Sequence, residues 1–200
     1  MIKRPFLLSV KRGKRIIFSF KENKQNSFDD FISAAEYLIS QKYTDIDHLG
    51  ILGGSNGGLL VSAVAVQRPD LFKAVCSRVP LTDMVRFPKF GIAVRWIHEY
   101  GNPETKDDLK KILKWSPYHN IQNGMEYPSI LFATADKDTR IDPLHARKMT
   151  ALLQSINKKN KVLLVTEIEA GHGAGKPISK MVELQSLVLT FFAQELGLKL

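Results

Sequence analysis

The sequence predicts an α/β protein in which a mostly parallel sheet carries helices on both faces. Short apolar segments alternate along the chain with longer segments of helical periodicity, the pattern of strand–helix–strand units. One apolar segment, residues 49–52, ends in a glycine-rich turn and continues as a second helical segment. Such alternation requires helices that cross over the sheet, and these cover its faces.

Size and composition are those of a single domain. The chain has 200 residues, 44% of them hydrophobic, which is enough for a substantial core. We expect no membrane span, because no run of about 18 apolar residues occurs, and the apolar patch at residues 6–10 is too short for a signal peptide. Cys76 is the only cysteine, so we predict a buried thiol in a reducing compartment and a cytoplasmic protein.

The basic charge is concentrated at the start of the chain. The net charge is +9, and residues 1–24 hold eight basic side chains against one acidic one. We therefore divide the chain into a basic leader, residues 1–21, and a nearly neutral folded domain, residues 22–200. A solvated tail is the common role of such a leader. We expect no nucleic-acid partner, although a binding protein that uses this leader stays an alternative.

Regular elements follow from the periodicity in chain order. Strands are predicted at residues 48–52, 72–79, 129–135 and 162–168. Helices are predicted at residues 27–39, 56–69, 102–114, 143–156 and 177–196, the first with Ser27 and Asp30 as its N-terminal cap. Residues 15–20 have strand character without a clear partner, residues 83–101 are aromatic and unassigned, and residues 116–127 form a loop.

The glycine-rich turn has the spacing of a nucleophile elbow. Gly53, Ser55 and Gly57 fit the pattern G-x-S-x-G, in which a strained turn between strand and helix exposes a serine hydroxyl. The glycines suit a turn whose backbone a Cβ would oppose. The alternative is a glycine-rich turn with an incidental serine.

Two further residues follow predicted strands at the same end of the sheet, where chemistry in parallel sheets gathers. Asp138 follows residues 129–135, and His172 follows residues 162–168. A serine needs a base to take its proton, and a histidine oriented by a carboxylate supplies one. The order Ser, Asp, His is that of α/β hydrolases. Asp136 and Asp142 compete with Asp138 for the role of the acid. Asp138 could instead cap the helix that follows, and Gly-His-Gly is often only a turn.

Six segments resemble the catalytic domain of the prolyl oligopeptidase family of serine peptidases, from about residue 22 to the C-terminus. They are residues 23–31 (NKQNSFDDF), 53–60 (GGSNGGLL), 67–72 (QRPDLF), 115–120 (WSPYHN), 134–140 (TADKDTR) and 170–177 (AGHGAGKP). The resemblance implies an α/β-hydrolase fold and an endopeptidase or oligopeptidase that cleaves short peptides after proline through an acyl-enzyme. It implies no cofactor and no metal, and leaves the oligomeric state unknown.

The same resemblance implies individual roles. Ser55 would be the nucleophile, His172 the base and Asp138 the orienting acid. The backbone N–H of Asn56 would donate to the oxyanion. In the substrate-binding site, Trp96 would stack on the substrate proline with Tyr100 beside it, and Arg140 would hold a peptide carbonyl. Core packing is the alternative for Trp96 and Tyr100, and an ion pair with Asp142 is the alternative for Arg140.

The start of the chain departs from the family. Where relatives carry the first strands and a tyrosine that is the second oxyanion donor, this chain has the basic leader, and it has no room for the family's β-propeller. We therefore expect a chain truncated at its N-terminus, with the elbow strand at the edge of the sheet and residues 16–20 as its only candidate partner. A catalytically inactive fragment is the corresponding alternative.

Overall fold

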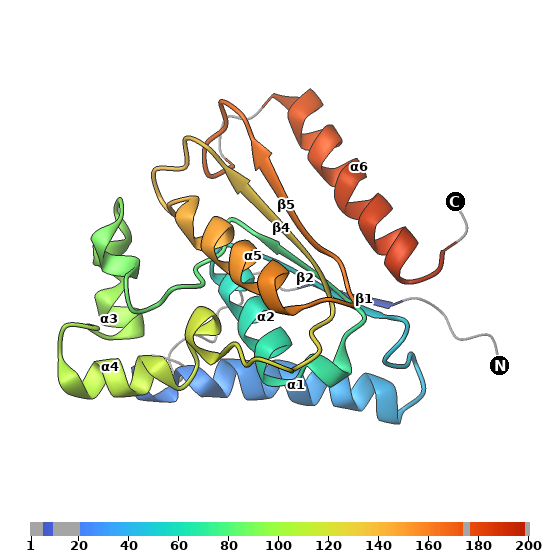
Figure 1. Ribbon diagram of the computed structural model, residues 1–200, viewed down its shortest axis with the longest axis horizontal. Helices are drawn as coiled ribbons and strands as arrows, with labels where there is room; N and C mark the ends of the chain where they lie inside the picture. Colours follow the sequence, from blue (N-terminus) through green and yellow to red (C-terminus); the bar gives the residue numbers. More distant parts are fainter. Residues whose placement is uncertain (1–5, 10–20, 174–176, 199–200) are drawn as a thin grey trace.

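The fold is a five-stranded parallel sheet between two unequal helical layers (Figure 1). The structure is a computed structural model and describes residues 6–9, 21–173 and 177–198. The strands are β1 (Phe6–Ser9), β2 (Leu49–Gly54), β3 (Ala74–Arg78), β4 (Ser129–Ala135) and β5 (Val162–Glu167), in the spatial order 1-2-3-4-5. Every neighbouring pair is parallel, which confirms the predicted sheet.

The helices cover different faces of the sheet. They are α1 (Lys24–Ser40), α2 (Asn56–Gln67), α3 (Ile97–Tyr100), α4 (Lys106–Leu113), α5 (Leu144–Ile156) and α6 (Ile178–Glu195). In Figure 1, α1, α2 and α5 lie on one side of the sheet and α6 lies on the other. A right-handed crossover between successive strands places each connecting helix on the same face, whereas α6 follows the last strand and is free to cover the other face.

Five short 3₁₀ turns complete the described elements: Lys21–Asn23, Pro69–Leu71, Phe87–Lys89, Ala93–Trp96 and Pro117–Asn120. Two of them and α3 account for the aromatic segment that the periodicity left unassigned. Its aromatic spacing has no single period, which is why no helix or strand was predicted there.

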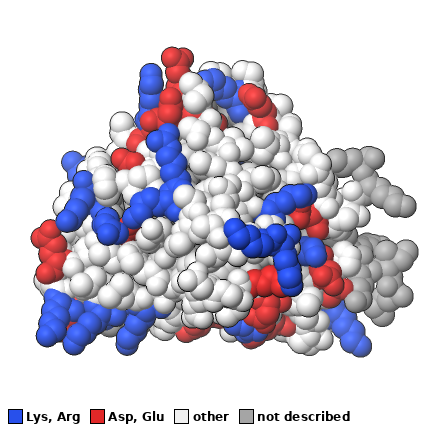
Figure 2. Space-filling model, in the orientation of Figure 1, with Lys and Arg blue, Asp and Glu red and all other residues white. Residues whose placement is uncertain are grey.

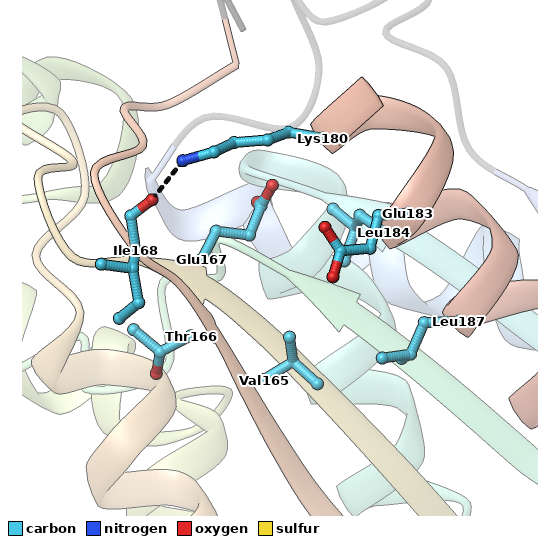
Figure 3. A pocket seen from close by; sticks show the side chains of 8 residues that line it. All are labelled: Val165, Thr166, Glu167, Ile168, Lys180, Glu183, Leu184 and Leu187. Carbon is cyan, nitrogen blue, oxygen red and sulfur yellow. Dashed lines mark hydrogen bonds between the residues drawn. The ribbon is translucent and has the colours of Figure 1, made fainter. Parts of the chain in front are cut away.

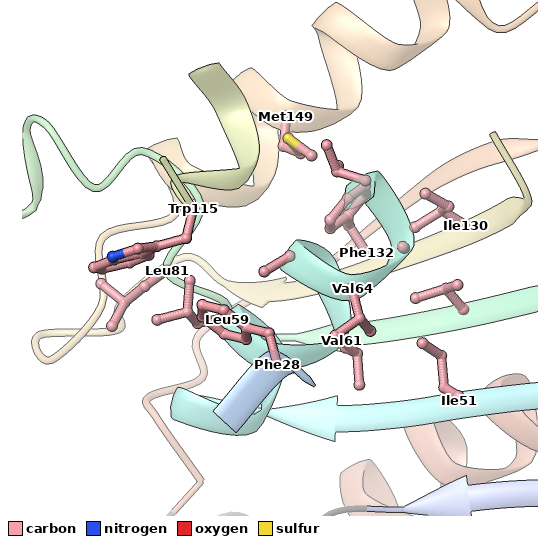
Figure 4. Close-up of a cluster of buried hydrophobic side chains, with 14 of the residues drawn as sticks. Phe28, Ile51, Leu59, Val61, Val64, Leu81, Trp115, Ile130, Phe132 and Met149 are labelled. Carbon is pink, nitrogen blue, oxygen red and sulfur yellow. The ribbon is translucent and has the colours of Figure 1, made fainter. Parts of the chain in front are cut away.

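The larger core lies between the sheet and α2. Eight of the twelve residues of α2 are buried, as expected for a helix that is apolar nearly all round. Figure 4 shows Leu59, Val61 and Val64 of this helix among side chains of the strands and neighbouring segments. The smaller core joins α6 to β3 and β4 and includes Cys76. Burial raises the pKa of the Cys76 thiol to about 12, so the thiol is a structural group.

The sheet edge corrects one expectation. The elbow strand β2 is not at the edge, because β1 pairs with it from Phe6↔Leu49 to Ser9↔Leu52. This strand comes from the basic leader, where the apolar residues 6–8 lie between basic residues at 3–4 and 11–12. The expected partner, residues 16–20, lies outside the described residues.

The start of α1 corrects a second expectation, the position of the N-terminal cap. The helix begins at Lys24, with Asn23 as its N-cap residue and without a side-chain cap bond, so the cap predicted at Ser27 is wrong. The extra turn is stabilised by tertiary contacts of Lys24, which lie beyond the reach of a local capping rule.

Candidate active site

Ser55 is the single residue between strand β2 and helix α2, at the carboxyl end of the sheet. β2 ends at Gly54 and α2 begins at Asn56. The backbone of Ser55 has φ 58° and ψ −119°, a strained conformation for a residue with a side chain. Its N–H donates to the carbonyl of Arg78, 2.9 Å away, which ties the turn to the neighbouring strand. This is the geometry of the predicted elbow.

Gly53 explains why the turn needs glycine. A Cβ at this position would lie 2.1 Å from the carbonyl oxygen of Gly57. Real Cβ atoms do not approach backbone this closely, so the passage of the strand beside the first turn of the helix requires that position 53 has no side chain.

The structure brings Ser55, His172 and Asp138 into one hydrogen-bonded chain. The Nε2 atom of His172 lies 3.2 Å from the Oγ of Ser55. Its Nδ1 atom lies 2.7 Å from the Oδ2 of Asp138. If Nδ1 carries the proton, its N–H donates a hydrogen bond to the carboxylate, and the unprotonated Nε2 can accept the proton of the Ser55 hydroxyl.

The surroundings of Asp138 favour the ionised form of its carboxyl group. Its carboxylate is buried, and burial alone would raise its pKa. The hydrogen bond from His172 and those from the backbone N–H groups of Ile141 and Arg140, both 2.9 Å, outweigh burial, so the pKa of Asp138 lies below its ordinary value. An ionised carboxylate here would stabilise a protonated His172.

The two competing aspartates have other partners. Asp136 accepts a hydrogen bond from the backbone N–H of Ala170 at 3.2 Å, and so fastens the loop that carries His172. Asp142 accepts the N–H of Leu144 at 2.8 Å, in the first turn of α5. Of the three, Asp138 is the one that contacts His172.

Asn56 begins α2 directly after Ser55. The first N–H groups of a helix have no acceptor within the helix, and the helix dipole places partial positive charge there. The backbone N–H of Asn56 is therefore suited to an oxyanion. Its side chain contacts two residues that the sequence analysis did not single out, Lys24 and Glu99. No local sequence signal links them, because they lie 32 and 43 residues from Asn56.

The three predicted substrate-binding residues lie in different environments. Trp96 is half-buried and packs against the larger core. Tyr100 is only 3% exposed and makes an edge-to-face contact with Phe87, with ring centroids 5.5 Å apart. Arg140 is exposed, two residues after Asp138. Core packing thus describes the surroundings of Tyr100, and the predicted substrate contacts of all three stay predictions.

A separate cavity of about 270 Å³ lies between β5 and α6. Figure 3 shows Val165 and Glu167 of β5 facing the α6 side chains Glu183, Leu184 and Leu187. Lys180 crosses its rim and donates a hydrogen bond to the carbonyl of Ile168 at 2.6 Å. Ser55, His172 and Asp138 are not among the residues that line it.

On the face drawn in Figure 2, the basic and acidic side chains of the described residues are interspersed. Within residues 6–9, 21–173 and 177–198, no helix has both the length and the apolar character to cross a membrane. The same residues contain no group of three histidine, cysteine or acidic side chains arranged to hold a metal ion.

Comparison with known proteins gives a consistent result. The prolyl oligopeptidase family matches residues 18–199. A prolyl endopeptidase of Dictyostelium discoideum is 44% identical over 184 residues, which are 90% of this chain and 24% of the relative. The chain thus spans about a quarter of the length of the curated relatives it matches.

Two solved structures extend the likeness to three dimensions. A prolyl endopeptidase from a study of inter-domain dynamics has a TM-score of 0.88 and 46% identity, covering 90% of this chain and 27% of that one. Prolyl oligopeptidase B from Galerina marginata, bound to a 35-residue hydrolysis and macrocyclization substrate, has a TM-score of 0.86 and 36% identity. The match covers 91% of this chain and 26% of that one.

Proposed function

Because the chain belongs to the prolyl oligopeptidase family, we propose that it is a serine endopeptidase or oligopeptidase that cleaves short peptides after proline. The observation that carries the proposal is the continuous hydrogen-bonded chain from Asp138 through His172 to Ser55. Its two distances, 2.7 and 3.2 Å, are within the reach needed for proton transfer.

The proposed reaction is acyl transfer in two steps. The Oγ of Ser55 attacks the carbonyl carbon that follows the proline ring, and its proton moves to the Nε2 of His172. The protonated His172 then gives this proton to the leaving amine, the peptide bond breaks, and an acyl-enzyme remains. Water, deprotonated by His172, then attacks the ester carbonyl of the acyl-enzyme. The bond to the Oγ of Ser55 breaks, His172 returns the proton to this Oγ, and a peptide that ends in proline is released.

The remaining residues stabilise the oxyanion and bind the proline-containing peptide. The backbone N–H of Asn56 donates to the oxygen that becomes negatively charged in each tetrahedral intermediate. Trp96 stacks on the proline ring and Tyr100 supports it from the core, while Arg140 holds a carbonyl of the bound peptide. We also propose a cytoplasmic location, because Cys76 is a buried free thiol, as expected of a protein in a reducing compartment.

The direct test is hydrolysis of a short peptide with one internal proline, compared with a peptide that has alanine in its place. We expect cleavage on the carboxyl side of proline at least about tenfold faster than in the alanine peptide, the discrimination that one ring-filled pocket gives. Equal cleavage of both peptides, or equal cleavage by Ser55→Ala, would contradict the proposal.

A second candidate is a chain whose triad is assembled but which does not turn over peptides. One observation favours it: the chain covers only about a quarter of the length of the relatives it matches. A fluorophosphonate needs only the nucleophile and its immediate surroundings. Labelling of Ser55 without peptide hydrolysis would support this second candidate.

A further inference from the structure

The carboxamide of Asn56 is held from both ends by a buried ion pair. Its Nδ2 donates to the Oε1 of Glu99 at 3.1 Å, and its Oδ1 accepts from the Nζ of Lys24 at 3.4 Å. Lys24 also donates to the same Oε1 of Glu99 at 3.4 Å. The three side chains therefore form a closed triangle of hydrogen bonds beside Ser55.

The triangle joins three segments that are distant in the sequence. Lys24 is the first residue of α1, Asn56 the first of α2, and Glu99 lies in α3. The Nζ of Lys24 also lies 5.1 Å from the centroid of the Tyr100 ring, a cation–π contact. The ammonium group thus has a fixed position, held by a carboxylate, an amide oxygen and an aromatic face.

Stability alone is a weak reason for this arrangement. Lys24 is 4% exposed and Glu99 9%, and a buried ion pair is often no more stable than apolar residues of similar volume. Burial lowers the pKa of Lys24 from its ordinary value despite the opposing effect of Glu99. The charged pair needs another explanation, and its contact with the residue after Ser55 suggests one.

The geometry of Asn56 links side chain and backbone. As the first residue of α2 it carries an N–H that the helix leaves without an acceptor. A carboxamide fixed at both its donor and its acceptor end cannot rotate freely, and this restricts the backbone at the start of α2. An oxyanion donor must be held in place before reaction to be effective, because reorientation during the reaction costs energy.

We propose that Lys24 and Glu99 are positioning residues that hold Asn56 so that its backbone N–H points to the developing oxyanion. This inference rests on the proposed function in one respect only, the reaction at Ser55. The holding of Asn56 itself is a property of the folded chain that can be measured without any reaction.

The main test replaces the pair by apolar residues, Lys24→Met with Glu99→Leu. If the pair serves only stability, this double variant labels with a fluorophosphonate as fast as the parent. If the pair positions Asn56, we expect labelling of Ser55 to slow by about tenfold or more, up to the 10²–10³-fold typical of a lost oxyanion donor. The reagent concentration for half-maximal rate should change by less than about twofold, because encounter is not affected.

Two further variants keep the result interpretable. Glu99→Gln keeps an acceptor near the Nδ2 of Asn56, so we expect a smaller loss than in the double variant. Gln25→Ala is the matched control: Gln25 joins α1 to Gln67 of α2 at 2.8 Å without touching Asn56, and its labelling rate should equal that of the parent. If the double variant does not fold, the single variant Lys24→Met, which removes the donor to the Oδ1 of Asn56, takes its place, and parental labelling of that variant would overturn the proposal.

A second measurement separates this inference from the proposed function. In a ¹⁵N-labelled chain, the double variant should shift both the carboxamide and backbone N–H resonances of Asn56 and speed exchange of the carboxamide protons. Unchanged resonances and exchange would overturn the positioning role. An unlabelled parent chain would overturn the proposed function, and the resonances would still decide the positioning.

Discussion

The Nε2 of His172 lies 3.2 Å from the Oγ of Ser55, although 117 residues separate them in the chain. Strands β3 and β4 lie between the strands that carry these residues, so the β5 loop must reach back across about 14 Å, three strand spacings. The turn after β4 holds this loop in place. The backbone N–H of Lys137 donates to the carbonyl of Ala170 at 3.1 Å, and the carboxylate of Asp136 accepts the Ala170 N–H. His172 is thus positioned by the same turn that carries Asp138.

Gly53→Ala should destabilise the chain by at least about 2 kcal/mol, because the new Cβ would meet the Gly57 carbonyl oxygen 2.1 Å away and the backbone must move. Gly54→Ala is the matched control, since the atoms nearest to its Cβ lie 3.8 Å away. Urea unfolding of the two variants measures the difference. Equal midpoints for both variants would contradict this account of the elbow.

Asp138→Asn should reduce peptide turnover by about 10³–10⁴-fold with little change in KM, because a carboxamide donor favours the wrong tautomer of His172. Asp136→Asn is its control: the amide oxygen can still accept the Ala170 N–H, and we expect less than a fivefold effect, on the scale of one neutral hydrogen bond. A similar loss in both variants would show that loop anchoring, and not the tautomer, governs turnover.

Trp96→Ala should lower kcat/KM for a proline peptide by about 10- to 100-fold, as expected for the loss of one aromatic stacking surface. The labelling rate of Ser55 by a small fluorophosphonate should stay within about threefold of the parent, because this reagent has no proline ring that could stack on Trp96. Labelling that falls in parallel with kcat/KM would mean that the substitution disturbs the fold and would support the core-packing alternative.

His145 should make stability depend on pH between about 6.5 and 4. It is 1% exposed, and its Nδ1 accepts hydrogen bonds from the backbone N–H groups of Thr82 and Asp83. Burial lowers its pKa to about 4. With the folded pKa below the unfolded one, the stabilisation is complete above pH 6.5 and is lost as pH falls toward 4, on the order of 3 kcal/mol.

The variant His145→Gln isolates this effect, because an amide oxygen can accept the same two hydrogen bonds but does not titrate in this range. Its unfolding free energy should fall less steeply than that of the parent between pH 6.5 and 4. Other titrating groups, such as His119 and Asp83, are common to both chains and cancel in the comparison. Parallel pH profiles would contradict the neutral, buried state of His145.

The parallel sheet and the turn around Ser55 were predictable because their signals are local. Apolar strands, glycine spacing and residues at strand ends are read within a few positions of each other. The pairing of residues 6–9 with β2 could not be predicted, since so short a segment, with three apolar residues among basic ones, has no periodicity that selects a partner. Its discovery moves the elbow strand from the edge to the interior of the sheet.

The contacts of Asn56 show the same limit within the site. Lys24 lies among charged residues that a sequence-based interpretation assigns to solvent, and Glu99 lies in an aromatic segment without a clear period. Only the fold brings them to one point, where each is buried. Tyr100 is the converse case: the family resemblance predicts a substrate contact, and the structure gives it a core environment.

Labelling by a fluorophosphonate reports directly on whether Ser55 is a nucleophile that His172 activates. The parent chain is treated with a fluorophosphonate at pH 7, digested and analysed by mass spectrometry, with Ser55→Ala and His172→Ala in parallel. The account predicts a single phosphonylated peptide that contains Ser55, labelling slowed by at least about 10²-fold in His172→Ala, and none at that peptide in Ser55→Ala. An unlabelled parent chain, or labelling of Ser55 at the same rate without His172, would contradict it.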